Sequence, residues 1–142
     1  MNQPCLVVGM DGSANADRAL ALAIDLALRT DGRLVLVHVF EPLAHLEQMA
    51  GVHDFAALAE SARALLAEEW SEPARRAGIE HELRLVHGSP AEALLDVADA
   101  VDASFVVLGA RGRGRLEGLL LGSTSSKAVQ ASRRPVIVVP PA

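Results

Sequence analysis

The chain has 142 residues, of which 51% are hydrophobic and 3% aromatic, and its formal net charge at pH 7 is −5. This length and apolar content predict one globular domain, residues 1–142, with a core of its own. The acidic balance and the scarcity of aromatic residues argue against a nucleic-acid partner. No apolar stretch approaches the ~20 residues that cross a bilayer, so we expect a cytoplasmic protein with no membrane partner.

Strand-like and helix-like segments alternate along the chain. The apolar run 4–10 predicts a first strand, after which Ser13 suits the N-cap position of a helix. Apolar residues then recur at helical spacing as far as residue 30, and residues 33–40 have the pattern of a second strand. The later pattern predicts a helix from 54, strands at 79–87, 104–108 and 135–139, a helix from 90, and a helix at 123–131.

One proline falls inside a predicted helix. Pro73 lies late in the helical pattern that begins at residue 54, and a proline inside a helix removes a backbone hydrogen bond. It should therefore kink or end that helix, or start a second short helix with Ser71 as its N-cap. The run Ser89-Pro-Ala-Glu92 has the pattern of a capping box and predicts a firm start for the next helix.

Continuous apolar strands separated by amphipathic helices predict a parallel sheet covered by helices on both faces. In such open α/β sheets, ligands bind beyond the carboxyl ends of the strands, where the strand order reverses. Three segments follow predicted carboxyl ends, namely residues 9–13, 39–40 and 109–126. If the first and fourth strands are neighbours, these segments meet in one pocket.

The last of these segments has the features of a phosphate-binding loop. Glycine lets the backbone approach an anion closely, and orphan N–H groups at a helix N-terminus favour negative charge. The residues predicted to bind phosphate in this way are Gly109, Gly112, Gly122, Ser123, Thr124 and Ser125. The alternative is a flexible loop followed by an ordinary N-cap serine.

The other two segments could hold the rest of a nucleotide. The candidate residues there are Gly9, Asp11 and Val39. Asp11 could accept hydrogen bonds from a ribose or a base, although it also suits a turn, and Val39 could form an apolar wall, although it also suits a core strand. The sequence contains no P-loop spacing, serine-nucleophile elbow or paired metal-ligand spacing, so we predict no catalytic residues and no metal site.

The spacing Gly109-x-x-Gly112, nine residues, then Gly122-Ser123 resembles the ATP-binding signature of the universal stress protein family. Asp11, His38-Val39 and the final Arg-Pro-Val-Ile-Val-Val resemble further parts of that family's pattern, so the resemblance covers nearly the whole chain. It implies an adenine nucleotide alpha hydrolase-like α/β fold, with an open five-stranded parallel sheet of order 3-2-1-4-5 and helices on both faces, and it implies a homodimer.

The resemblance also implies a ligand, ATP with Mg²⁺, and a role for each matching residue. The Asp11 position would contact the adenosine, and the Val39 position would line the adenine pocket. The positions that would approach the ribose and phosphates are Gly109 and Gly112, and those that would hold the phosphate tail are Gly122, Ser123 and Ser125.

These inferences favour a nucleotide-responsive regulatory protein of the stress response over an enzyme. ATP occupancy would change the order of the loop, and hence which protein partner the dimer binds. Two alternatives stay open: a slow ATPase or nucleotidyl-transferring enzyme of the same fold, for which Glu117 is the only acidic candidate in the loop, and an apo dimer acting as an interaction module. The apolar strand 135–139 would lie at a sheet edge, which pairing of two copies would cover.

Overall fold

The computed structural model describes residues 2–41, 55–111 and 121–142, and these form a five-stranded parallel sheet of order β3-β2-β1-β4-β5. The predicted fold class and strand order are therefore confirmed. The strands are β1 Cys5–Gly9, β2 Arg33–Phe40, β3 His81–His87, β4 Phe105–Gly109 and β5 Val136–Val139. The helices are α1 Ala14–Thr30, α3 Phe55–Ala64, the π-helix η1 Leu65–Trp70, α4 Glu72–Ala77, α5 Pro90–Ala100 and α6 Ser123–Ala131.

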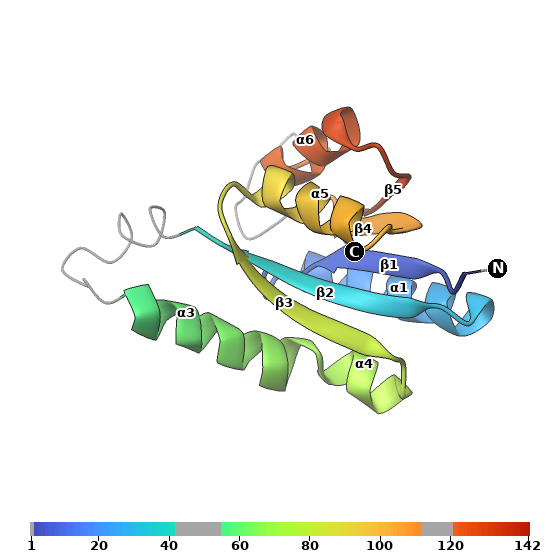
Figure 1. Cartoon of the computed structure of the whole chain (residues 1–142), viewed down its shortest axis with the longest axis horizontal. Helices are drawn as coiled ribbons and strands as arrows, with labels where there is room; N and C mark the ends of the chain where they lie inside the picture. Colours follow the sequence, from blue (N-terminus) through green and yellow to red (C-terminus); the bar gives the residue numbers. More distant parts are fainter. Residues whose placement is uncertain (1, 42–54, 112–120) are drawn as a thin grey trace.

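The core has two layers, one on each face of the sheet. Successive residues of a strand point to opposite faces, so Leu6 and Val8 of β1 pack with α1, η1 and α4, whereas Cys5 and Val7 pack with α5 and α6. Figure 1 shows α5 and α6 on one side of the sheet and α3 and α4 on the other. Both faces of the central strands are thus buried, which explains their unbroken apolar sequences.

The first helix has the caps that its sequence predicts. The Ser13 hydroxyl accepts a hydrogen bond from the Ala16 N–H at 3.1 Å, so Ser13 is the N-cap of α1. At the other end Asp31 adopts a left-handed conformation with φ of 55°, and its N–H is bonded to the Ala27 carbonyl. The N-cap fixes where α1 begins, and a bond from the Ser13 N–H to the Asp11 carboxylate shapes the turn between β1 and this helix.

The predicted helix around Pro73 is divided into three elements. Of the three outcomes that Pro73 allows, a second short helix is the one observed, since α4 begins at Glu72 with the proline in its first turn. The preceding π-helix η1 was not predicted, and Ser71 does not cap α4 with its side chain. Instead the buried Ser71 hydroxyl donates back to the Ala67 carbonyl at 2.9 Å, because the break leaves carbonyls of η1 without helical partners.

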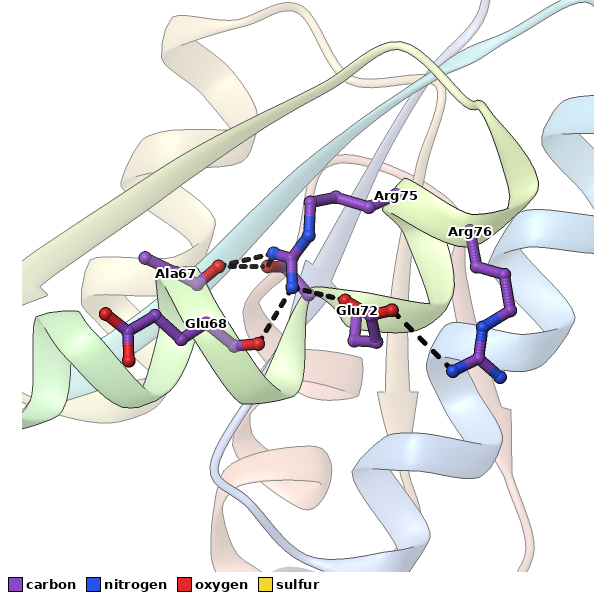
Figure 2. Close-up of polar contacts among 6 residues, drawn as sticks. Ala67, Glu68, Glu72, Arg75 and Arg76 are labelled. Atoms are coloured by element: carbon purple, nitrogen blue, oxygen red, sulfur yellow. Dashed lines mark hydrogen bonds and ion pairs between the residues drawn. The ribbon is translucent and has the colours of Figure 1, made fainter.

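Arg75 donates hydrogen bonds to two backbone carbonyls of η1 at this break. Its guanidinium reaches back from α4 and donates to the Ala67 carbonyl, to the Glu68 carbonyl at 2.8 Å and to the Glu72 carboxylate at 2.5 Å (Figure 2). The neighbouring Arg76 makes only a 3.6 Å ion pair with Glu72. One arginine side chain therefore joins η1 to α4, and through Trp70 and Ala74 it supports the packing of both on the sheet.

We expect the substitution Arg75→Ala to lower the free energy of unfolding by about 1 kcal/mol, because it removes the side-chain donor of the Glu68 carbonyl and one of the two side-chain donors of the Ala67 carbonyl. The matched substitution Arg76→Ala removes an exposed ion pair of the same helix and should cost less than about 0.5 kcal/mol. Urea unfolding curves, analysed with one m-value for wild type and variants, measure both changes in the free energy of unfolding. Equal destabilisation by the two substitutions would contradict this role for Arg75.

Candidate functional site

The strand order reverses between β1 and β4. The chain runs outward from β1 to β2 and β3 on one side, and from β4 to β5 on the other. Pairing of Val8 with Val107 brings the carboxyl ends of the two central strands to one edge. The predicted adjacency of the first and fourth strands is therefore confirmed, and the carboxyl ends of β1, β2 and β4 lie at the same edge of the sheet.

The turn after β1 holds Asp11 in a fixed position. One Asp11 carboxylate oxygen accepts the Ser13 N–H at 2.9 Å, and its other oxygen makes no hydrogen bond to a described residue. The preceding Met10 is fixed on both sides, since its N–H is bonded to the Val37 carbonyl at 2.7 Å and its carbonyl accepts from His38 Nδ1 at 2.7 Å. Asp11 is thus a turn residue, which is one of the two interpretations made from the sequence. Its second carboxylate oxygen is an acceptor that a ligand could use.

Negative charge gathers on the α1 side of this edge. Burial raises the pKa of Asp17, in the first turn of α1, above its ordinary value, and the nearby carboxylates of Asp11 and Glu69 raise that pKa further. Like charges that disfavour ionisation of a carboxyl group also disfavour a phosphate beside it. The β1–α1 side is therefore better suited to hydroxyl and amine groups than to phosphates.

Of the candidate glycines, Gly109 is required by packing, whereas an added Cβ at Gly9 would meet the end of a flexible leucine side chain. A Cβ on Gly109 would lie 2.8 to 2.9 Å from Asn15, including its backbone carbonyl, and a Cβ on Gly9 would lie 2.6 Å from Leu108 Cδ2. Glycine at position 109 therefore lets α1 approach β4, whatever ligand binds there. Gly112 lies outside the described residues, as does Glu117.

The two ends of the glycine loop are bonded to each other. The Gly122 N–H donates to the Ala110 carbonyl at 2.6 Å, and the buried Ser125 hydroxyl donates to the same carbonyl at 2.8 Å and to the Gly122 carbonyl at 3.2 Å. These two groups were expected to face phosphate. In this structure they join the end of β4 to the start of α6, so they fix the position of the α6 N-terminus.

The N-terminus of α6 is open. Its N-cap is Gly122, with φ of −74° and no side-chain cap, and the first backbone bond of the helix joins the Ser126 N–H to the Gly122 carbonyl. The preceding N–H groups, those of Ser123, Thr124 and Ser125, make no hydrogen bond to a described residue. Together with the hydroxyls of Ser123 and Thr124, they form a set of donors at the positive end of a helix, which is an arrangement that binds anions.

Val39 lies in β2, which is on the other side of β1 from β4. It pairs with Val86 of β3, is half-buried, and packs against the cluster of apolar residues under α5. It is thus a core strand residue that retains some exposed surface near the carboxyl end of β2, and its role as a wall for a base stays a prediction.

Sequence reasoning missed Asn15. Only 8% of this residue is exposed, and its side chain is bonded to Arg111, which follows β4, and to Val139, the last residue of β5. The signal was present, because Asn15 precedes Ala19, Ala23 and Ala27 at intervals of four and so occupies the inward stripe of α1. A polar residue on that stripe indicates a buried hydrogen-bonding role.

Across residues 2–41, 55–111 and 121–142, no three His, Cys, Asp or Glu side chains lie close enough together to hold a metal ion. The same part of the chain contains no helix with the length and hydropathy of a membrane span. The groups of the candidate site that could bind a ligand are the N–H groups at the start of α6, the hydroxyls of Ser123 and Thr124, and the Asp11 carboxylate.

The doubly wound parallel sheet, with a helix N-terminus open at the point where the strand order reverses, defines an α/β protein of the adenine nucleotide alpha hydrolase-like class. The model of the Universal stress protein family matches residues 5–140. The chain belongs to the universal stress protein family.

Relatives support this assignment along nearly the whole chain. A universal stress protein of Mycobacterium bovis is 38% identical over 136 residues, which cover 94% of this chain and 44% of the relative. A universal stress protein of Thermus aquaticus is 34% identical over 136 residues, which cover 94% of this chain and 96% of the relative. The chain thus spans about half the length of the mycobacterial relatives that it matches.

Two solved structures of the family contain nucleotides. A universal stress protein in complex with cAMP has a TM-score of 0.73 and 28% identity, and the match covers 99% of this chain and 98% of that one. A universal stress protein from Archaeoglobus fulgidus in complex with dAMP has a TM-score of 0.71 and 25% identity, and the match covers 97% of this chain and 98% of that one.

Proposed function

We propose that this chain is an ATP-binding universal stress protein that acts in the cytoplasm as a nucleotide-responsive regulator. The observation that carries the proposal is the open N-terminus of α6 at the point where the strand order reverses. Support comes from the complete glycine spacing at 109, 112 and 122 and from the family members that bind cAMP and dAMP. These neighbours bind adenine nucleotides, and the choice of ATP is part of the proposal.

The charges at the site favour one orientation of the nucleotide. The phosphates would bind at the α6 N-terminus, where the N–H groups and hydroxyls of Ser123 and Thr124 are available. The adenosine would bind on the β1–β2 side, with Asp11 accepting from its hydroxyls or amine and Val39 against the base. The acidic environment of Asp17 disfavours the reverse orientation.

We propose that Mg²⁺ enters with the triphosphate. Mg²⁺ keeps several of its waters and is commonly bound through substrate phosphates together with one or two protein oxygens. The hydroxyls of Ser123 and Thr124 are oxygens of the kind that such an ion accepts. They fit a phosphate-bound Mg²⁺, whose charge would lower the repulsion between the triphosphate and the neighbouring carboxylates.

The substitution Asp11→Ala tests the adenosine side of the proposal. We expect it to weaken ATP binding about tenfold, because a charged hydrogen bond contributes roughly 1.5–3 kcal/mol. The control is Asp25→Ala, which removes a carboxylate of α1 whose one ion pair among the described residues is with the exposed Arg29. If equilibrium binding shows the same ATP affinity for both variants, Asp11 does not contact the ligand.

We also expect ATP hydrolysis to be slow, with a turnover far below the ~1–100 s⁻¹ of kinases. Fast hydrolysis needs a side chain that positions the attacking water, in addition to donors for the phosphates. The carboxylates of Asp11 and Asp17 belong to the β1–α1 turn and the first turn of α1, and α6 itself contains no acidic residue. Phosphate release measured under saturating ATP and Mg²⁺ tests this, and a kinase-like rate by the isolated protein would favour the alternative of an enzyme.

A further inference from the structure

Asn15 joins the glycine loop to the last strand. Its side-chain oxygen accepts the Arg111 N–H at 2.7 Å, and its side-chain nitrogen donates to the Val139 carbonyl at 3.0 Å. Because an N–H must meet the oxygen and a carbonyl must meet the nitrogen, these partners fix the orientation of the amide. One buried side chain on α1 is thus bonded to Arg111, the second residue after β4, and to Val139, the final residue of β5.

The same region contains further bonds that make it one unit. The Ala110 N–H donates to the Val139 carbonyl at 2.8 Å, and the Ala110 carbonyl accepts from Gly122 and Ser125. The missing Cβ of Gly109 lets Asn15 lie against the end of β4. The backbone at residues 109–111 therefore cannot shift without disturbing bonds both to the start of α6 and to the end of β5.

We propose that Asn15 is a positioning residue that couples nucleotide binding at the α6 N-terminus to the order of β5. The inference rests on the proposed nucleotide binding and adds a route by which that binding reaches the edge strand. A ligand that restricts the motion of Gly122 and α6 also restricts Ala110, which is bonded to Gly122. The Asn15 amide, bonded to Arg111 and to Val139, would then restrict the motion of β5 as well. By thermodynamic linkage, a change that orders β5 then raises nucleotide affinity by the same factor.

Amide hydrogen exchange of β5, with and without saturating ATP and Mg²⁺, tests the coupling on the full chain. In the wild type, we expect ATP to slow exchange in residues 136–139 by about fivefold or more, which is the lower range of measured couplings. The substitution Asn15→Ala should reduce the effect of ATP to less than about half of its wild-type value, because only the direct bond from Ala110 to Val139 then remains to carry it. The substitution Asn15→Ser, whose short side chain cannot bond both Arg111 and Val139, should reduce it likewise.

The matched control is Arg18→Ala. Arg18 also ties α1 to the C-terminal segment, through a 3.1 Å bond from its Nε to the Pro140 carbonyl, and it makes no hydrogen bond to residues 109–111. This variant should exchange faster near β5 in the absence of ATP and should still show the full effect of ATP. A merely structural role for Asn15 would make the two variants behave alike.

The outcomes separate the two proposals. If calorimetry detects no ATP binding to the wild type, the proposed function fails. If the wild type binds ATP but exchange in β5 does not respond, or responds equally in the Asn15 variants, the coupling is overturned while nucleotide binding stands. Should Asn15→Ala not fold, the Asn15→Ser variant, which keeps a small neutral polar side chain at this buried position, gives the decisive comparison, because the effect of ATP is measured within each variant at saturation.

Discussion

Replacing Gly122 with valine is expected to weaken ATP binding at least about tenfold, which corresponds to ~1.4 kcal/mol. Gly122 is the N-cap of α6, and a branched side chain there would crowd the donors of Ser123 and Thr124. Its φ of −74° and ψ of 175° are values that valine adopts readily, so backbone strain should not unfold the protein. The expected effect is therefore on binding more than on stability.

A matched substitution at the other end of the same helix separates the two effects. Ala131→Val adds the same β-branching at an exposed position at the C-terminal end of α6 and should leave ATP affinity unchanged. Calorimetric titration of both variants, with thermal unfolding as the check on folding, makes the comparison. Equal affinities in wild type and Gly122→Val would remove the α6 N-terminus from the binding site.

The second large effect is expected at the edge of the sheet. We propose that the chain forms a homodimer through β5, and that Val138→Lys weakens the dimer at least about tenfold by placing a charge in the contact. Among the described strands, β5 pairs with β4 alone, and its residues 136–138 are only half-buried. Val129 of α6, the helix that contacts β5, is 49% exposed, so apolar surface is available beside this edge.

The opposite edge of the sheet provides the control for that experiment. Leu83 of β3 is 36% exposed, and β3 pairs only with β2 in the described sheet. Leu83→Lys should leave the dimer intact, whereas Val138→Lys should release monomers at micromolar concentration. Light scattering that finds a monomeric wild type, or equal dissociation by both variants, would contradict dimerisation through β5.

Local patterns were sufficient for most of the fold. The α6 bounds 123–131 and the N-cap Ser13 follow from signals within a few residues, and the structure has both. The π-helix was not predictable in this way, because Leu65, Leu66 and Trp70 suit an α-helical stripe equally well. Arg75 donates to two of its carbonyls from the following helix, and no pattern within η1 indicates that contact.

Within the candidate site, the sequence indicated the segments better than the individual contacts. That the residues after β1 and β4 meet follows from the parallel sheet, but the bonds of Ser125 and Asn15 depend on tertiary contacts. Asn15 reaches partners 96 and 124 residues away, so no local pattern fixes its role. Ser89 gives a similar lesson, since α5 begins at Pro90 as predicted and yet the Ser89 hydroxyl makes no cap bond.

The central claim is that this chain binds ATP, and one titration tests it most directly. Calorimetric titration of the wild-type chain with ATP in the presence of Mg²⁺ should give one saturable site per chain, with a Kd at or below the micromolar range, about −8 kcal/mol. The absence of saturable binding at ATP concentrations up to ~1 mM, where a binding free energy of only about −4 kcal/mol would be detected, would contradict the account.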